Sequence, residues 1–182
     1  MSLQSNSERY FVITGGPGSG KTSLLDALAA RGYQRSSEAG RALIQQQVAI
    51  GGRALPWRDP LAFAEQMLSW EIRSYQMAEQ APGLVFFDRG VPDVAGYLRL
   101  LNMPVPDHVR KAAQIFRYNL LVFLAPPWPE IYTQDRERRQ HFDEAVRTCE
   151  ALRATYSDLG YEIHELPRAP IDERVSFVLA TS

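Results

Sequence analysis

The chain has 182 residues, enough for one domain with a sizeable core, and its 45% hydrophobic and 23% charged residues are ordinary for a globular protein. A formal net charge of −1 gives no indication of a surface for nucleic acid or anionic membranes. A single cysteine excludes an intramolecular disulfide and suits a cytoplasmic location, and no apolar run approaches the ~20 residues of a membrane span.

Short apolar runs alternate with longer amphipathic ones, a pattern typical of βα units and a parallel sheet. We expect strands at 10–14, 32–36, 83–88, 120–125 and 161–166. The runs 84–87 and 120–124 are continuously apolar, as strands covered by helices on both faces are. The sequence therefore predicts a three-layer α/β/α sandwich over residues 1–182, with a five-stranded, mostly parallel sheet and a flexible start at 1–8.

Capping residues indicate where the helices begin and end. A helix is expected over 22–31, and another from about Ala39 to the glycine pair 51–52. Asp59 and Pro60 predict an N-cap followed by proline at the first helical position, for a helix that runs to about residue 80. Asp107 is the expected N-cap of the next helical stretch.

The helix that follows Asp59 carries two apolar stripes, so two of its sides are expected to be covered. One side packs on the sheet. The other either lines a substrate cavity or is simply enclosed by the fold. The first stripe consists of Leu61, Leu68, Ile72 and Tyr75, and the second of Phe63, Met67, Trp70 and Met77.

The segment 15–22 matches the phosphate-binding pattern G-x-x-x-x-G-K-[ST] at every required position, between a predicted strand and a predicted helix. Glycines let backbone N–H groups turn inward around phosphate, and the helix N-terminus adds a positive dipole. Lys21 is expected at the β- and γ-phosphates, and the Thr22 hydroxyl on Mg²⁺. The predicted nucleotide-binding residues are Gly15, Gly16, Pro17, Gly18, Ser19, Gly20, Lys21, Thr22 and Ser23.

Asp88 ends a buried apolar strand, where proteins with such a loop (P-loop proteins) place an acidic metal ligand. We expect it to hold Mg²⁺ directly or through water; the alternative is a cap of the following helix. The predicted fold is thus a P-loop NTPase sandwich like that of small kinases. Its P-loop strand is central, and the Asp88 strand lies beside it.

At Asp88-Arg89-Gly90 the sequence resembles the nucleoside- and nucleotide-kinase branch of P-loop proteins. The resemblance implies that Arg89 points at the phosphoryl acceptor, although a surface ion pair is the alternative. It also implies a lid-like segment at 130–142 that closes arginines over the transferred group; a solvated helix face is the competing interpretation. The candidate lid arginines are Arg136, Arg138 and Arg139.

The same resemblance makes Glu38 the candidate general base, with Arg41 supporting the acceptor or the charge. The alternative role for Glu38 is that of an acid favoured by the dipole at a helix N-terminus.

Across nearly the whole chain the pattern resembles a bacterial P-loop family catalogued among AAA-type ATPase domains but built like small kinases, with the ribosylnicotinamide-kinase type domain among its relatives. The segments that carry this resemblance are 15–22, 37–41, 86–93 and 124–128. It implies ATP as the nucleotide, with Mg²⁺, and leaves the substrate undefined.

Two acceptor types remain open. A nucleoside monophosphate calls for several cations near Arg89, which Arg41 and Arg73 or Arg99 would supply. A neutral hydroxyl acceptor calls for Glu38 as base and an apolar slot with one amide. The resemblance makes Gln66 the candidate amide, because related deoxynucleoside kinases place a glutamine on this helix; the alternative is a surface residue. Tyr97 and Tyr75 are candidate walls.

These features predict an ATP- and Mg²⁺-dependent phosphotransferase acting on a small, nucleoside-like metabolite. The expected partners are a nucleoside triphosphate and an unidentified small-molecule acceptor, without nucleic acid or membrane. A partner-stimulated ATPase, which would add a protein partner, and a non-catalytic ATP sensor are the alternatives. The guanine-reading Asn-Lys-x-Asp motif is absent from the sequence, which disfavours a GTPase.

Overall fold

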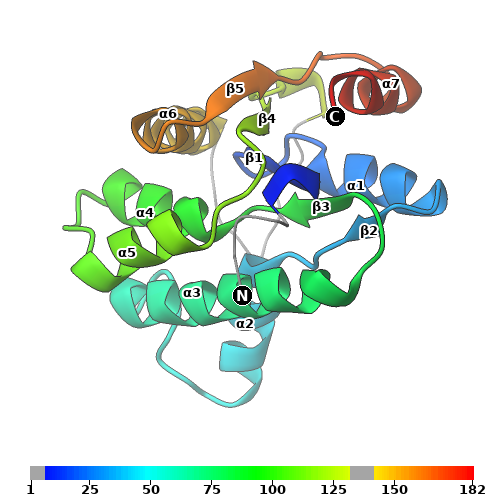
Figure 1. Cartoon of the computed structure of the whole chain (residues 1–182). Coiled ribbons are helices and arrows are strands. Elements are labelled where there is room, and N and C mark those ends of the chain that lie inside the picture. Colours follow the sequence, from blue (N-terminus) through cyan, green and yellow to red (C-terminus); the bar gives the residue numbers. More distant parts are fainter. Residues whose placement is uncertain (1–6, 132–141) are drawn as a thin grey trace.

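The computed structural model describes residues 7–131 and 142–182 (Figure 1). All five predicted strands are confirmed within one or two residues at each end. The elements are η2 (Ser7–Arg9), β1 (Tyr10–Gly15), α1 (Lys21–Ala30), β2 (Gln34–Arg35), α2 (Ala39–Ala49), α3 (Pro60–Met77), η3 (Ala78–Gln80), β3 (Val85–Asp88), α4 (Val91–Leu100), α5 (Asp107–Ile115), β4 (Leu121–Ala125), η4 (Pro129–Ile131), α6 (Phe142–Asp158), β5 (Glu162–Glu165) and α7 (Ile171–Thr181).

The five strands form one sheet in the order β2-β3-β1-β4-β5, and every neighbouring pair is parallel. The expected central position of β1, with β3 beside it, is confirmed. Ile13 of β1 is in register with Asp88 of β3, so the P-loop and Asp88 leave the sheet at the same edge. Ligands of open parallel sheets bind at this carboxyl edge.

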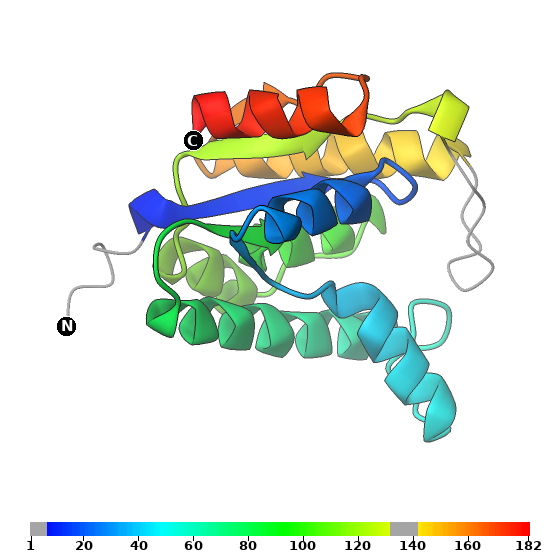
Figure 2. The same ribbon diagram turned by 90° about the vertical axis from the view of Figure 1, so that its right-hand side faces the viewer.

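Alternate residues of β1 face opposite helical layers because side chains of a strand alternate between its two faces. Phe11 and Ile13 pack in a core with residues of α1 and α7, such as Leu28 and Val178. Tyr10 and Val12 belong to a core that α3, α4, α5 and α6 complete. Helices α1 and α7 lie on the side of the sheet that faces the viewer in Figure 2, so the predicted three-layer arrangement is confirmed.

The predicted start of α3 is confirmed: Pro60 is its first residue, and Asp59 Oδ1 accepts a hydrogen bond of 3.0 Å from the Ala62 N–H. The two predicted stripes are each partly wrong. Leu61 and Met77 are exposed at 41% and 64%, because each lies near an end of the helix. The remaining members of both stripes are buried or half-buried.

The predicted N-cap at Asp107 is wrong by one residue. Pro106 caps α5, and its carbonyl accepts 3.1 Å hydrogen bonds from the N–H groups of Val109 and Arg110. Asp107 is the first helical residue and pairs with Arg110 at 2.9 Å.

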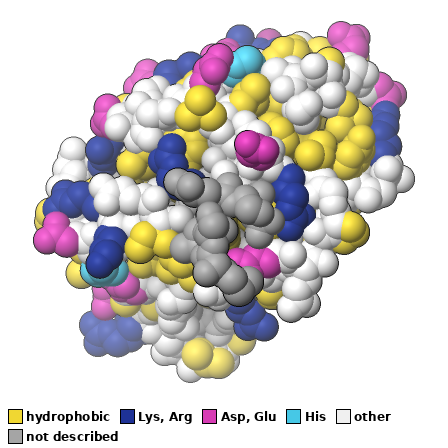
Figure 3. All heavy atoms as spheres, viewed as in Figure 1, with side chains coloured by type: hydrophobic (Ala, Val, Ile, Leu, Met, Phe, Trp, Pro, Cys, Tyr) yellow, Lys and Arg dark blue, Asp and Glu magenta, His cyan; other side chains and the backbone are white. Residues whose placement is uncertain are grey.

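Acidic and basic side chains are interspersed on the face seen in Figure 3. Within 7–131 and 142–182, no helix combines the length and the apolar character needed to cross a bilayer.

Candidate active site

The loop between β1 and α1 has the backbone geometry of an anion-binding turn. Gly18 and Gly20 have φ angles of 69° and 77°, in the left-handed region that favours glycine. At Gly15 a side chain is excluded by packing, since a Cβ would lie 2.4 Å from the carbonyl oxygen of Ala125. Gly20 occupies the N-cap of α1 without a side chain to cap it, so the first N–H groups of the helix suit a bound anion.

Lys21 is buried and curls back over the loop. Its Nζ donates hydrogen bonds to the Gly16 carbonyl at 2.7 Å and to Ser19 Oγ at 3.3 Å. Ser19 Oγ also donates to the Gly16 carbonyl at 2.8 Å. The ammonium is therefore held inside the turn formed by the loop.

Asp88, at the end of β3, is 1% exposed. Its N–H donates to Ser36 Oγ at 2.9 Å. Its Oδ1 is buried without a hydrogen-bond partner among the residues that the structure describes. Burial raises the pKa of the Asp88 carboxyl, and the nearby charges of Lys21 and Arg89 oppose that rise. An orphaned buried carboxylate oxygen is costly unless a cation or donor satisfies it, so Asp88 fits a metal ligand.

Arg89 has a φ of 71°, which is unfavourable for a residue with a side chain. Its N–H donates to the Ile13 carbonyl at 3.1 Å, which ties the turn after β3 to the P-loop strand. Its guanidinium Nη1 lies 3.2 Å from Asp93 Oδ1, one helical turn further along the chain. Backbone strain of this kind is typically retained where it serves a site.

Asp93 links four parts of the site through its two buried carboxylate oxygens. Besides Arg89, Oδ1 accepts a hydrogen bond from the hydroxyl of Thr14, at the end of β1. Oδ2 accepts from the Gly90 N–H at 2.9 Å and from the Tyr156 hydroxyl at 2.6 Å. Asp93 thus joins the P-loop strand, the turn after β3, α4 and α6.

Glu71 lies on α3, is 2% exposed, and has an Oε2 atom without a hydrogen-bond partner in the described part of the chain. Burial raises the pKa of its carboxyl well above the ordinary value. The negative charges of Asp93 and Asp88 raise it further, and Arg89 opposes them. A third acidic side chain therefore lies within the electrostatic reach of the site.

A cavity of about 480 Å³ opens over the P-loop. One wall comes from the loop and the start of α1, and the opposite wall from the segments after β4 and before α7. Glu38 and Arg41 lie at its border. Its lining consists of Gly18, Ser19, Gly20, Lys21, Thr22, Ser23, Glu38, Arg41, Trp128, Ile131, Ala169, Pro170, Ile171 and Arg174.

Arg174 of α7 lines the donor cavity and is hydrogen-bonded to the P-loop. It is 3% exposed and donates 3.2 Å hydrogen bonds to the carbonyls of Gly20 and Ser19. Its guanidinium carbon lies 5.7 Å from the centre of the Trp128 ring. The C-terminal helix therefore supports the loop that the sequence motif identifies.

A second cavity of about 390 Å³ lies between α3, α4 and α6. Glu38 lines both cavities, and Pro17 of the P-loop lines the second. Glu38 is at the N-cap position of α2 but makes no capping hydrogen bond with its side chain. The second cavity is lined by Pro17, Glu38, Gly40, Ile44, Pro56, Trp57, Phe63, Met67, Arg89, Asp93, Tyr97, Leu100, Leu101, Glu144, Thr148 and Leu152.

The structure distributes most of the residues predicted from sequence over these two cavities, whereas Gly15, Gly16 and Asp88 line neither. Residues 18–23 and Arg41 line the first; Pro17, Arg89 and Tyr97 line the second. Gln66 is half-buried on α3 and lines neither. Tyr75 is buried in the core and donates from its hydroxyl to the Arg117 carbonyl at 2.8 Å. Arg136, Arg138 and Arg139 lie outside the described residues.

Three residues of the site were missed from sequence: Glu71, Asp93 and Arg174. Glu71 carried a usable signal, because it is a charged residue one helical turn from both Met67 and Tyr75 on an otherwise apolar side of α3. Asp93 contacts Thr14 and Tyr156, and Arg174 contacts the P-loop; these partners are distant in sequence, and local patterns do not reveal them.

Comparison with solved structures places this fold among small kinases. The deoxyadenosine kinase from M. mycoides in complex with dCMP and dCDP has a TM-score of 0.65 at 12% identity, over 94% of this chain and 97% of its own. A NadR protein in complex with NR has a TM-score of 0.71 at 17% identity, over 96% of this chain but 50% of its own. Thymidylate kinase from Ehrlichia chaffeensis has a TM-score of 0.62 at 12% identity, over 94% of this chain and 97% of its own.

At these identities the likeness establishes the fold. A comparison with curated protein sequences finds no match. The profile of the family AAA_28, described as an AAA domain, matches residues 10–174, which include the P-loop, the Asp88-Arg89 turn and Arg174. The predicted resemblance is therefore confirmed, and the chain belongs to the AAA_28 family of AAA domains, with a nucleotide-binding fold of the small-kinase type.

Proposed function

We propose that the chain is an ATP- and Mg²⁺-dependent phosphotransferase that moves the γ-phosphoryl group of ATP to a small-molecule acceptor. The observation that carries the proposal is the position of Glu38, which lines both the cavity over the P-loop and the second cavity. A carboxylate at the boundary of a donor site and an acceptor site is placed to serve the transfer between them.

On the donor side, ATP occupies the cavity over the P-loop. The loop N–H groups and the Lys21 ammonium, which already lies within the turn, bind the β- and γ-phosphates. Ala169 and Pro170, which follow the last strand, border this cavity and are candidates for the adenine side.

The residues present at the site are suited to hold Mg²⁺. The Thr22 hydroxyl lines the donor cavity, and Asp88 offers a buried carboxylate oxygen without a partner among the described residues. Those residues contain no cluster of three or more His, Cys, Asp or Glu side chains, so the ion would depend on phosphate and water for its remaining ligands, as Mg²⁺ usually does. When bound, it would neutralise charge that develops on the phosphates.

On the acceptor side, the Glu38 carboxylate accepts the proton of an acceptor hydroxyl as its oxygen forms a bond to the γ-phosphorus. The bond from that phosphorus to the β–γ bridging oxygen breaks, and ADP leaves. Arg89 stabilises the negative charge on the transferred group, with its guanidinium held by Asp93.

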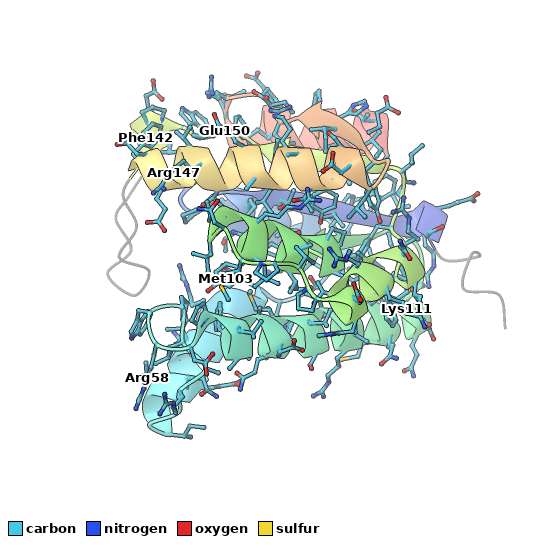
Figure 4. The ribbon with its side chains drawn as sticks, turned by 90° about the vertical axis from the view of Figure 1, so that its left-hand side faces the viewer. Arg58, Met103, Lys111, Phe142, Arg147 and Glu150 are labelled. Carbon is cyan, nitrogen blue, oxygen red and sulfur yellow. The ribbon has the colours of Figure 1, made fainter. Side chains whose placement is uncertain are left out.

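The names of the structural neighbours support a kinase: a deoxyadenosine kinase and a thymidylate kinase superpose over nearly their whole lengths. The test is acceptor-dependent ADP formation with Mg²⁺, against nucleosides, ribosylnicotinamide, nucleoside monophosphates and small alcohols. Lys21→Ala is the inactive variant. The chain's other lysine, Lys111, lies exposed on α5 (Figure 4) and provides Lys111→Ala as the matched control.

Turnover with one compound class that Lys21→Ala abolishes and Lys111→Ala retains supports the proposal. Acceptor-independent hydrolysis, or tight ATP binding without turnover, contradicts it and favours a partner-stimulated ATPase or an ATP sensor.

A further inference from the structure

The second cavity, which takes the acceptor if the proposed function holds, has a lining rich in carboxylates. Among the described residues it has three: Glu38 from the start of α2, Asp93 from α4 and Glu144 from α6. The one guanidinium in this lining belongs to Arg89, which is already paired with Asp93 at 3.2 Å. Formal negative charge therefore exceeds positive charge in the described lining.

Two further acids lie beneath this lining and add no positive charge to it. The Asp88 and Glu71 carboxyls are both buried, and each interacts electrostatically with Asp93 and Arg89. Among the described residues, a phosphate that enters this cavity would meet three carboxylates and would have to compete for the Arg89 guanidinium, which Asp93 already holds. Like charges brought together in a partly desolvated site repel each other more strongly than they do in water.

Within 7–131 and 142–182, the three arginines that the sequence offered for a phosphate-bearing acceptor lie outside the lining of this cavity. Arg41 lines the donor cavity. Arg73 lines a separate groove beside β2. Arg99 points from α4 to Asp158, with 2.7 Å between the guanidinium and the carboxylate.

The rest of the lining suits a flat apolar group. Phe63 and Tyr97 meet edge to face with ring centres 5.7 Å apart, and Trp57 and Met67 are among the other apolar residues of the lining. The Tyr97 hydroxyl is buried and has no hydrogen-bond partner within 7–131 and 142–182, so it offers one polar contact to a ligand. The volume of about 390 Å³ is that of a site for one small organic molecule.

We infer that the acceptor carries a hydroxyl and no phosphate, bears no net negative charge, and inserts a flat apolar ring into the second cavity. The inference rests on the proposed function in one respect, namely that the ligand of the second cavity is the phosphoryl acceptor. The charge preference of the cavity can be measured without any turnover.

The test places a thiol in the cavity by Met67→Cys and compares its rates of reaction with two reagents of similar size. One is the cationic aminoethyl methanethiosulfonate, and the other is the anionic sulfonatoethyl methanethiosulfonate. The ratio of the two rates reports the local potential, because the thiol's own reactivity cancels. The unsubstituted chain, whose cysteine is buried, supplies the background rate.

The reference thiol is Met77→Cys, exposed on the same helix. We expect the cation-to-anion rate ratio at position 67 to exceed that at position 77 by about tenfold or more, since charge-lined clefts concentrate counter-ions by 10 to 10³. Glu144→Gln in the Met67→Cys chain should lower the ratio. Glu150→Gln, on the same helix but in the lining of a different cavity, should not (Figure 4). Equal ratios at 67 and 77, or a preference for the anion, overturn the inference.

Failure of the inference and failure of the proposed function remain distinguishable. Transfer of phosphate to a nucleoside monophosphate in preference to its nucleoside would uphold the phosphotransferase and overturn the inferred acceptor class. A cation-preferring cavity in a chain that transfers nothing would uphold the charge preference and contradict the phosphotransferase.

Discussion

The guanidinium of Arg89 lies 3.2 Å from the carboxylate of Asp93, and the pair is largely buried, with 17% and 7% of the two side chains exposed. The same carboxylate accepts hydrogen bonds from Thr14 on the P-loop strand and from Tyr156 on α6. The geometry of the acceptor-side arginine is therefore tied to the donor loop through one aspartate.

Asp93→Asn is expected to destabilise the fold by about 1–3 kcal/mol, because it removes a buried charge that four donors share. It should also reduce kcat by more than it changes the affinity for ATP, since Arg89 loses its orientation. Urea unfolding and steady-state kinetics measure the two effects. The control is Asp158→Asn, which breaks the exposed pair with Arg99 and should change stability by no more than about 0.5 kcal/mol. Equal effects of the two variants would contradict a positioning role for Asp93.

Arg89 adopts a φ of 71°, so the residue that replaces it matters for the backbone as well as for the side chain. Arg89→Gly and Arg89→Ala both remove the guanidinium, and both should abolish acceptor-dependent turnover. Arg89→Gly should nevertheless be more stable than Arg89→Ala by about 1 kcal/mol, because glycine relieves left-handed strain. Thermal or urea unfolding of the two variants measures the difference.

Arg73, in the interior of α3, provides the opposite comparison, since Arg73→Ala should be more stable than Arg73→Gly by about 1 kcal/mol. If alanine were preferred at both positions, the strain assigned to Arg89 would be wrong.

Glu71 should make the stability of the fold fall as pH rises. Its pKa in the folded chain is raised by burial and by Asp93 and Asp88, so the folded state keeps a proton that the unfolded state releases above about pH 4.3. Its contribution is therefore intact below that pH and is lost progressively up to the raised folded pKa. Glu71→Gln removes this loss.

The free energy of unfolding of Glu71→Gln, measured in urea from pH 4.5 to 8, should decline less with pH than that of the unsubstituted chain. Glu79→Gln, at an exposed position of η3, is the control and should leave the slope unchanged. A steeper decline in Glu71→Gln would mean that Glu71 is charged and stabilising.

Arg174 links α7 to the P-loop, and Arg174→Met should weaken ATP binding by about tenfold, since it deletes two hydrogen bonds of roughly 0.5–1.5 kcal/mol each while keeping much of the apolar bulk. Calorimetric titration with ATP measures the change. Arg168→Met is the matched control, because Arg168 donates to the Pro127 carbonyl outside the donor cavity. An unchanged affinity in Arg174→Met would show that the P-loop keeps its shape without this brace.

The individual strands, the P-loop and the start of α3 could be predicted because each depends on residues adjacent in sequence. The phosphate-binding motif predicts the loop from its own residues, and the pair Asp59-Pro60 predicts the helix start without any other residue. The helix start near Asp107 was misplaced because Pro106 is also able to occupy the cap. Within the site, Asp93 meets Thr14 across 79 positions and Arg174 meets Gly20 across 154, separations that only the fold brings together.

Gln66 illustrates the limit of carrying a residue type over from a resemblance. Helical position decides whether a side chain reaches a cavity: Phe63 and Met67 line the second cavity, whereas Gln66 does not. Glu71, on the same helix, could have been predicted as a buried acid of the site, because it is a charged residue between the apolar positions of α3.

The most direct test of the central claim is Glu38→Gln, since Glu38 lines both the donor and the acceptor cavity. ATP affinity and the rate of acceptor-dependent ADP formation are measured in the same preparation, with Glu150→Gln as the control. If Glu38 serves phosphoryl transfer, the rate falls by 10²–10⁴, the usual contribution of a general base, while the dissociation constant of ATP changes by less than about threefold. A rate of ADP formation that is unchanged in Glu38→Gln would contradict transfer between the two cavities.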